Sequence, residues 1–418
     1  MTYQETLDFM FSQLPMYHRI GAAAYKADIQ PTIDMMATLG NPERKFKSIH
    51  VAGTNGKGSV SHFLASILQE AGYKVGLYTS PHLVDFRERI RINGEMIPQS
   101  VVVDFVDHYR DMFDRLHLSF FEMTVGLAFD YFAKEQVDIA VIEVGMGGRL
   151  DSTNVITPLL SIITNIGLDH TQFLGDTLEK IAVEKAGIIK EGVPVVIGET
   201  QPETKPVFER IAAEHHAPIT FADNHYQVVR IEDYTEELTG EYQKKNIATV
   251  LEAVEVLGKT TDMALSPAVV RRGLARVVTN THLHGRWQKI GESPLTICET
   301  AHNAPGIDSM LGKLATMDFR ALHVIYGCVN DKDYRKILTH LHTEFAKLGK
   351  PFDWRFSQPS VPRGLPVADL QAAAHELGIE GAAYVNVKEA IAAAQKEADD
   401  KDLVLVTGSI FLIADALA

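Results

Sequence analysis

The feature that most constrains this chain is a glycine-rich loop between a predicted strand and an amphipathic helix. Residues 46–52 read as a strand, and residues 57–71 repeat their apolar side chains at the helical period of 3.6. The loop between them comprises Gly53, Thr54, Asn55, Gly56, Lys57, Gly58 and Ser59. A strand, a glycine-rich loop with Gly-Lys and a helix in this order predict a phosphate-binding loop.

The chemistry of such a loop follows from its residue types. Glycines let backbone N–H groups turn inward around phosphate oxygens, and the helix N-terminus and Lys57 add positive charge. A tight turn with a chance lysine is the alternative, but the flanking strand and helix favour the phosphate loop. Gly58 follows the lysine where Ser or Thr usually ligates Mg²⁺, and Ser59 stands one place later. The metal therefore needs an oxygen ligand from elsewhere.

The remaining pattern alternates strands and helices. Continuous apolar runs at residues 137–144 and 159–165 fit central parallel strands that are covered on both faces. Further strands are expected at residues 74–79 and 193–198, and helices at residues 100–116 and 122–134.

A second series starts near residue 295. Strands are predicted at residues 295–299, 322–327, 352–356 and 403–407, with helices that include residues 333–348 and 387–397. The polar segment 281–294 marks the domain junction. The fold class is therefore α/β. We predict a mainly parallel sheet domain with the phosphate loop over residues 1–286, followed by a smaller Rossmann-like domain over residues 287–418.

Composition excludes several classes of protein. The net charge is −14, with 40 Lys and Arg against 54 Asp and Glu, which disfavours nucleic-acid binding. No apolar run approaches the ~20 residues that a bilayer-spanning helix needs, so we expect no membrane span. The first residues show no secretory signal, and Cys298 and Cys328 fit buried, reduced thiols. We therefore expect a cytoplasmic protein.

Six motifs in sequence order together resemble the folylpolyglutamate synthase/dihydrofolate synthase family, a branch of the Mur ligases. They occupy residues 53–59, 76–83, 86–90, 143–154, 167–170 and 184–190. The resemblance continues more thinly at residues 240–246, 285–286, 301–303, 331–333 and 407–409. Glu299 stands where the family usually has Asp, which keeps the charge on a longer arm.

The resemblance implies amide synthesis driven by ATP. L-Glutamate would be joined to dihydropteroate, to tetrahydrofolate (poly)glutamates or to both, through an acyl phosphate, with ATP and two Mg²⁺ ions as cofactors. Phosphoryl transfer needs positioning and charge neutralisation rather than an activated nucleophile. The sequence agrees, because it shows no convincing Gly-x-Ser-x-Gly elbow.

The resemblance also assigns metal ligands. Glu143, which ends an apolar strand, and Ser80, which ends the neighbouring strand, would hold the first Mg²⁺. A turn-capping carboxylate and an ordinary turn serine are the alternatives. His170 would contact a second Mg²⁺, although a lone His is more often a packing residue. Lys185, otherwise a solvated helix lysine, would be carbamylated and would act in catalysis with Lys57 and His170.

Further residues are implied to bind the nucleotide and the substrate. Beyond the loop, the nucleotide contacts would be Asn246, Arg286, Glu299 and His302, with the site completed by closure of the second domain. The pteroate or folate would lie near Pro81, His82 and Asp151. Asp151 could equally cap the following turn, since Asp-Ser-Thr-Asn is rich in capping residues.

Other functions fit the sequence less well. A Mur ligase for a nucleotide-sugar peptide needs a domain before the loop, and only 52 residues precede Gly53. A non-synthetic phosphate-loop switch usually has Ser or Thr directly after the lysine, and a nucleotide kinase would lack the motifs at residues 167–170 and 301–303. A monofunctional folylpolyglutamate synthase remains open. We expect a monomer, because the chain's own second domain completes the site.

Overall fold

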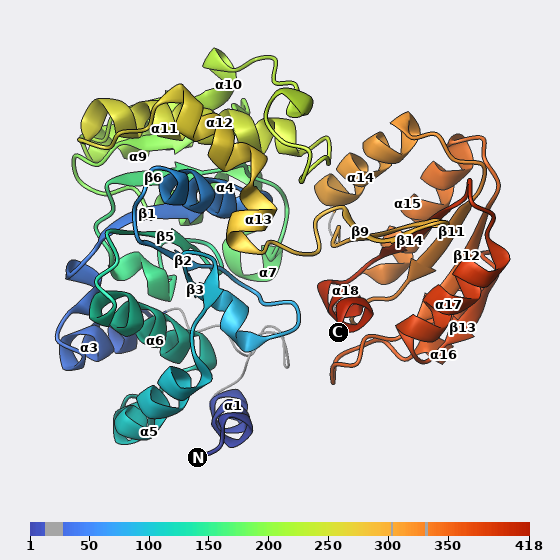
Figure 1. Cartoon of the computed structure of the whole chain (residues 1–418), viewed down its shortest axis with the longest axis horizontal. Helices are drawn as coiled ribbons and strands as arrows, with labels where there is room; N and C mark the ends of the chain where they lie inside the picture. Colours follow the sequence, from blue (N-terminus) through green and yellow to red (C-terminus); the bar gives the residue numbers. More distant parts are fainter. Residues whose placement is uncertain (13–27, 302–303, 331–332) are drawn as a thin grey trace. The chain divides into compact units, whose positions relative to one another are not determined.

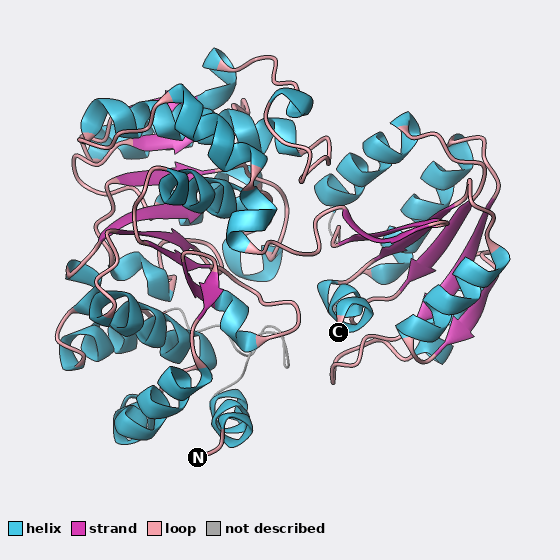
Figure 2. Ribbon diagram, viewed as in Figure 1, coloured by secondary structure: helices cyan, strands magenta, loops and turns pink. Residues whose placement is uncertain are grey.

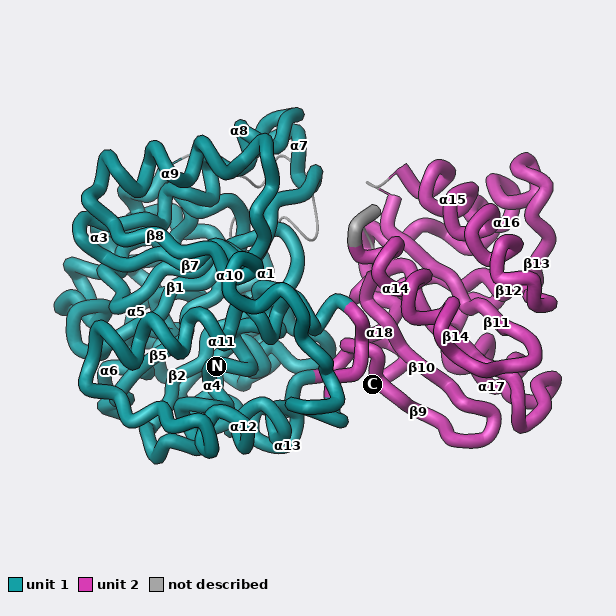
Figure 3. Tube along the Cα trace, turned by 90° about the horizontal axis from the view of Figure 1, so that it is seen from above, with its two compact units in different colours: residues 1–237, 242–283 teal, residues 238–241, 284–418 magenta. Residues whose placement is uncertain are grey.

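The computed structural model describes residues 1–12, 28–301, 304–330 and 333–418. The chain forms two compact units (Figure 3). The first contains Met1–Glu237 and Tyr242–Leu283, and the second contains Leu238–Glu241 and His284–Ala418. The unit boundary thus lies three residues before the domain boundary expected at 286.

The first unit is built on an eight-stranded sheet with the order β4-β3-β2-β5-β1-β6-β7-β8. Its strands are β1 (Lys47–Ala52), β2 (Val75–Tyr78), β3 (Ile90–Ile92), β4 (Glu95–Met96), β5 (Ile139–Glu143), β6 (Leu160–Ile163), β7 (Val195–Ile197) and β8 (Ile219–Phe221). Strands β2, β5, β1, β6, β7 and β8 run parallel, while β3 and β4 pair antiparallel at one edge. The carboxyl ends of β1, β2, β5 and β6 therefore meet at the same edge of the sheet.

Helices cover both faces of this sheet (Figure 1). They are α1 (Tyr3–Ser12), α3 (Gln30–Thr38), α4 (Lys57–Glu70), α5 (Gln99–Leu116), α6 (Phe120–Lys134), α7 (Thr171–Leu174), α8 (Leu178–Ala186), α9 (Lys205–Glu214), α10 (Ala222–His225), α11 (Gln243–Thr260), α12 (Pro267–Ala275) and α13 (Val277–Thr281). Short 3₁₀ turns lie at Pro42–Arg44, Phe86–Arg89, Ser152–Val155 and Ile231–Asp233. One core, which includes Met35 and Phe129, lies between α3, α5, α6 and the sheet, and another includes Ile181 and Phe208 under α8 and α9.

The second unit is a six-stranded sheet with the order β13-β12-β11-β14-β10-β9, flanked by helices (Figure 2). The strands are β9 (Gln288–Glu292), β10 (Leu295–Glu299), β11 (Leu322–Tyr326), β12 (Phe352–Ser357), β13 (Gly381–Tyr384) and β14 (Leu403–Thr407). The helices are α14 (Ala304–Thr316), α15 (Tyr334–Lys347), α16 (Val367–Glu376), α17 (Val387–Glu397) and α18 (Ile410–Leu417). All strands are parallel except β9, which pairs antiparallel with β10.

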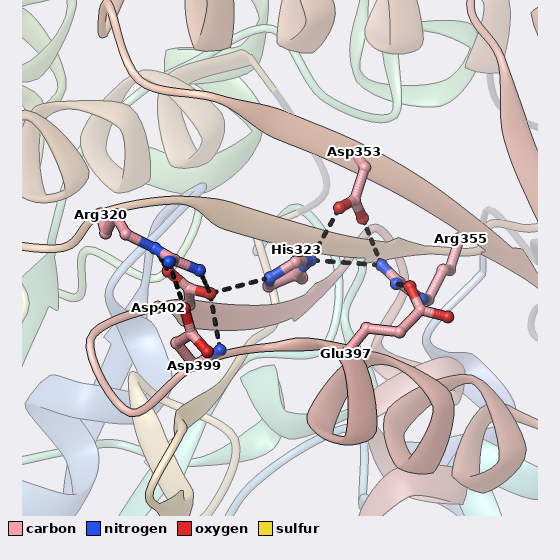
Figure 4. Close-up of polar contacts among 7 residues, drawn as sticks. All are labelled: Arg320, His323, Asp353, Arg355, Glu397, Asp399 and Asp402. Atoms are coloured by element: carbon pink, nitrogen blue, oxygen red, sulfur yellow. Dashed lines mark hydrogen bonds and ion pairs between the residues drawn. The ribbon is translucent and has the colours of Figure 1, made fainter.

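A polar network lies at the amino ends of the central strands of this second sheet (Figure 4). His323, the second residue of β11, has Nδ1 2.7 Å from Asp353 Oδ2 on β12 and Nε2 3.4 Å from Asp402 Oδ2. Two arginines surround these groups. Arg320 donates to Asp402 and pairs with Asp399, and Arg355 pairs with Asp353 and Glu397.

The predicted fold class is confirmed, and the predicted elements lie within a few residues of their expected positions. The continuous apolar runs became the central parallel strands, as expected for strands buried on both faces. Five strands that the structure describes were not predicted: β3, β4, β8, β9 and β13. Strand β9 lies in the polar segment assigned to the junction. Both cysteines are free and buried, as expected. Among the described residues, no helix has the length and apolarity to cross a membrane.

Candidate active site

The glycine-rich loop is held in place by the segment that follows β6. The Thr54 N–H donates to the carbonyl oxygen of Asn165, and the Asn55 N–H donates to the side-chain oxygen of the same residue, both at 2.9 Å. The Gly167 N–H donates to Thr54 Oγ1 at 2.9 Å. The loop backbone is therefore held by the end of the neighbouring strand.

Two glycines of the loop are required by close contacts. Gly53 has φ 145°, and a Cβ there would lie 1.8 Å from Thr164 Oγ1. Gly56 has φ 85°, and a Cβ there would lie 2.2 Å from Asn246 Oδ1. Asn246, on α11, thus lies directly against the loop. Both were expected to contact the nucleotide.

A short chain of side chains links Asn246 to the start of α4. Asn246 Nδ2 donates to Gln243 Oε1 at 2.8 Å, and Gln243 Nε2 donates to Ser59 Oγ at 3.2 Å. All three side chains are buried. Gln243 was not among the expected site residues, because its part depends on the approach of α11 to α4, which residue spacing does not reveal.

Two lysines converge on the loop. Lys57 Nζ donates to the carbonyl oxygens of Gly53 at 3.0 Å and Thr54 at 3.2 Å. Lys185 Nζ, from the end of α8, donates to the Gly53 carbonyl at 2.8 Å. Lys185 is buried and is not a solvated helix lysine. Burial, helped by the charge of Lys57, lowers the pKa of Lys185 to about 7.

Glu143 and Ser80 meet beside the loop. Glu143 is buried at the end of β5, and its Oε2 accepts the Ser80 N–H at 3.1 Å. A Cβ at Gly58 would lie 3.8 and 3.9 Å from the two carboxylate oxygens. The carboxylate therefore lies next to the first turn of α4, where the helix N-terminus attracts negative charge.

These oxygen atoms fit a magnesium ion. Mg²⁺ prefers oxygen ligands, and it commonly takes one or two carboxylates together with water and substrate phosphates. Glu143 could supply a carboxylate and Ser80 a hydroxyl. In the described part of the chain, no three His, Cys, Asp or Glu side chains gather as a metal site.

His170 lies in the next loop, after β6. Its backbone is left-handed, with φ 49°, and its N–H donates to Asp169 Oδ1 at 2.9 Å. The negative charge of Asp169 raises the pKa of Lys185 and so opposes the effect of burial. Asp169 belongs to the motif at 167–170 but was not singled out as a site residue. In the structure, the charge of Asp169 acts on Lys185.

The loop after Ser80 contains the expected substrate residues Pro81 and His82. Arg89 Nε donates to His82 Nδ1 at 2.8 Å. Arg89 is itself buried, and its guanidinium lies 5.2 Å from the centre of the Phe120 ring. The imidazole of His82 is therefore oriented by a buried cation.

Asp151 caps the turn that follows it. Its Oδ1 accepts the Thr153 N–H at 3.0 Å and the Thr153 hydroxyl at 2.5 Å, and its Oδ2 accepts the Met146 N–H at 2.9 Å. Burial raises the pKa of Asp151, while hydrogen bonds from Thr153 and Met146 oppose the rise. The capping alternative is thus realised, and the carboxylate is largely committed to donors of its own chain.

Two expected nucleotide residues lie together in the second unit. Glu299, buried at the carboxyl end of β10, accepts the Trp287 N–H at 2.9 Å through Oε2. Arg286 donates to Thr300 Oγ1 at 2.7 Å. His302 lies outside the described residues, as do Asn303, Asp331 and Lys332.

Two protein families match the chain in succession. The Mur ligase middle domain matches residues 51–263, and the Mur ligase glutamate ligase domain matches residues 285–410. Together they cover most of both units.

Individual relatives match along nearly the whole length. The folylpolyglutamate synthase of Lacticaseibacillus casei is 35% identical, over 99% of this chain and 97% of its own. The dihydrofolate synthase/folylpolyglutamate synthase of Bacillus subtilis is 34% identical, over 91% of this chain and 92% of its own.

A solved structure shows the same fold. The Mycobacterium tuberculosis folylpolyglutamate synthase complexed with ADP and AMPPCP superposes with a TM-score of 0.84 at 30% identity, over 93% of this chain and 94% of the other. With both domain families and full-length relatives above 30% identity, the chain belongs to the folylpolyglutamate synthase/dihydrofolate synthase family of the Mur ligases.

Proposed function

We propose that this protein is an ATP-dependent ligase that joins L-glutamate to dihydropteroate and to tetrahydrofolate (poly)glutamates. The carrying observation is the convergence of the phosphate loop, buried Glu143 and buried Lys185 at one edge of the first sheet. Relatives with both activities in their names support the bifunctional form.

The reaction has two steps. An oxygen of the acceptor carboxylate attacks the terminal phosphorus of ATP, and the bond to the ADP oxygen breaks, which leaves an acyl phosphate. The neutral glutamate amine then attacks the acyl carbon, phosphate leaves with the bonding electrons, and the nitrogen loses one proton to give the amide. Neither step needs a protein nucleophile, so the enzyme's task is to position the groups and to neutralise charge.

The loop and its neighbours supply that positioning. The backbone N–H groups at the start of α4 would face the phosphate with the helix dipole behind them, and Lys57 would add a full charge beside them. Asn246, against Gly56, limits the space at one side of the loop. Asn165 holds the loop backbone in place, which would preorganise the loop for the nucleotide.

Magnesium would be held by Ser80 and Glu143. When bound, it would neutralise phosphate charge during transfer. A second ion would lie towards His170 and Asp169, next to Lys185. The neutral amine of Lys185 adds to CO₂, and loss of one proton leaves a carbamate. The carbamate would place a negative charge beside Lys57, where the protonated form of Lys185 would place a second positive charge.

Residues 1–286 would form the ATP-binding domain and residues 287–418 the glutamate ligase domain. Arg286 and Glu299 would contact the nucleotide, as would His302. The protein would act as a monomer.

The first experiment is to measure ADP release by the purified protein with ATP, Mg²⁺ and L-glutamate, comparing dihydropteroate with tetrahydrofolate. Glutamate-dependent release with both acceptors is expected. Lys57→Ala should reduce the rate at least about 100-fold, since it removes a charge that stabilises the transition state. Lys47→Ala, an exposed lysine at the amino end of β1, is the matched control and should leave the rate unchanged.

The outcomes separate the candidate activities. Release with tetrahydrofolate alone would make the protein a monofunctional folylpolyglutamate synthase. The name of the 35% identical Lacticaseibacillus casei relative is folylpolyglutamate synthase. Release with neither acceptor would overturn the proposed substrates. Normal activity of Lys57→Ala would overturn the assignment of the phosphate loop.

A further inference from the structure

A fully buried histidine lies in the middle of the first sheet. His50 is on β1, where it is in register with Ile142 of β5 on one side and Ser161 of β6 on the other. Its Nε2 lies 2.9 Å from Oγ1 of Thr153, in the loop after β5. None of the roles described above uses this side chain.

The direction of each hydrogen bond follows from the acceptor at the far end. Thr153 Oγ1 lies 2.5 Å from Asp151 Oδ1, and the carboxylate also accepts backbone N–H groups, so it can only accept from the hydroxyl. Thr153 has one proton to donate and gives it to Asp151. His50 must therefore carry its proton on Nε2 and donate it to Thr153.

The other ring nitrogen, Nδ1, indicates that the hydrogen bond from Nε2 to Thr153 is the reason for a histidine at this position. Nδ1 of His50 has no hydrogen-bond partner among the described residues. An unpartnered buried nitrogen is unfavourable, so a leucine would fill this space at lower cost. The hydrogen bond that Nε2–H donates to Thr153 therefore explains why this position has a histidine.

Asp151 connects this hydrogen bond to the loop that lies between Glu143 and Lys185, the two candidate site residues. Its Oδ2 holds the Met146 N–H, three residues after Glu143. The same loop then packs tightly on the end of α8. A Cβ at Gly148 would lie 2.8 Å from the carbonyl oxygen of Lys185, and the Arg149 N–H donates to the Glu184 carbonyl at 2.8 Å.

We propose that His50 is a positioning residue. Through Thr153 and Asp151 it fixes the loop 145–151, and this loop sets the distance between Glu143 at the end of β5 and Lys185 at the end of α8. The anchor is the central strand that also leads into the phosphate loop. The inference rests on the proposed function only where it concerns activity, because the hydrogen-bond chain itself is tested without turnover.

Conservative variants separate positioning from packing. In His50→Gln the amide nitrogen is as many bonds from Cβ as Nε2 is, so the donor is kept, whereas His50→Leu keeps the volume without a donor. We expect His50→Leu to raise the half-saturating Mg²⁺ concentration or lower kcat by about 10-fold, and His50→Gln to stay within about 3-fold of the wild type. KM for ATP should change less than kcat, because the phosphate loop is held separately by Asn165.

A second pair of variants tests the same chain at its middle. Thr153→Val removes the hydroxyl and Thr153→Ser keeps it. In a double-mutant cycle, His50→Leu with Thr153→Val should cost no more than the larger single change, because both break one chain. Additive losses would overturn the proposal, as would a His50→Leu enzyme whose half-saturating Mg²⁺ concentration and kcat both match those of His50→Gln. If His50→Leu fails to fold, the Thr153 pair decides alone.

Two readouts do not depend on catalysis. Amide hydrogen exchange at Met146 and Thr153 should speed up in His50→Leu and stay slow in His50→Gln. In the wild type, ¹⁵N NMR should show His50 as the neutral form with its proton on Nε2 across neutral pH. Unchanged exchange in His50→Leu, or a proton on Nδ1, would overturn the proposal. If the wild type shows no glutamate-dependent ADP release, the proposed function is overturned. The exchange and NMR tests of His50 would still apply.

Discussion

Lys57 and Lys185 donate to the same carbonyl oxygen, that of Gly53. Two ammonium groups around one oxygen repel each other, and Lys185 is also removed from water. The sequence predicts Lys57 from its loop, but it cannot predict the burial of Lys185. That burial depends on how α8 packs across the end of β1, many residues away in the chain.

A prediction for Lys185 follows from its pKa of about 7. At neutral pH a large fraction of the amine is uncharged, and only this form reacts with CO₂. Purging CO₂ from the assay should lower the rate of ADP release roughly 10-fold, and bicarbonate should restore it. Lys185→Gln should be slow and indifferent to CO₂. Equal wild-type rates in purged and bicarbonate buffers would argue against a carbamate.

Gly56 yields a second prediction at this scale. Gly56→Ala and Gly72→Ala both place a side chain at positive φ, 85° and 91°, but a Cβ at Gly72 has nothing within 4 Å. Both should lose about 1–2 kcal/mol of stability from backbone strain. Gly56→Ala alone should also displace Asn246 and weaken ADP binding more than 10-fold. Denaturant unfolding and calorimetric titration measure the two effects, and equal ADP affinities would contradict the expectation.

The elements differ in how far the sequence predicts them. The bounds of β14 and α17 were predicted to the residue, because an apolar run and a clear helical period mark them. Strand β9 was missed, since it is a half-exposed edge strand with Gln288, Lys289 and Glu292. Local pattern does not show which polar segment pairs with a buried neighbour.

The site divides in the same way. Loop residues such as Lys57 follow from a local motif, and Asp151 was expected either to cap its turn or to contact substrate. The parts played by Asn165, Gln243 and His50 were not predicted, because each depends on contact between segments distant in sequence.

The polar network of Figure 4 gives a prediction at the scale of the second sheet. The hydrogen bond to Asp353 raises the pKa of His323 above 6.5, although burial opposes it. The folded state then binds the proton more tightly than the unfolded state. The resulting stability is fully present below pH 6.5 and is lost as the pH rises through the raised pKa.

The two carboxylates that contact His323 stay charged in this window, because the pKa of each is lowered. The pKa of Asp402 is lowered chiefly by Arg320. That of Asp353 is also lowered, since the hydrogen bond from His323 and the charge of Arg355 together exceed the effect of burial. Arg320, Arg355, Asp399 and Glu397 complete the set. His323→Asn keeps a donor towards Asp353 without titrating. In denaturant unfolding, the free energy of unfolding of the wild type should exceed that of this variant by about 1 kcal/mol at pH 6 and by less at pH 8. A constant difference would contradict the sign.

At the scale of the whole molecule, each unit has its own hydrophobic core. Units with separate cores usually unfold as separate cooperative blocks. Phe129 on α6 and Phe345 on α15 are both fully buried, one in each unit, and truncating either should cost about 3–5 kcal/mol. Calorimetry should therefore show two transitions, with Phe129→Ala lowering one and Phe345→Ala the other. Both variants lowering a single shared transition would contradict this expectation.

The segment Leu238–Glu241 has a consequence for how the protein can be divided. It belongs to the second unit, while the residues on either side of it belong to the first, so the chain passes between the units three times. A cut after residue 283 would leave the first fragment carrying a piece of the other unit's structure and the second fragment missing it. Neither half of the gene encodes a complete unit. A chimaera that exchanges the second unit with a relative must therefore replace two separate stretches of the sequence.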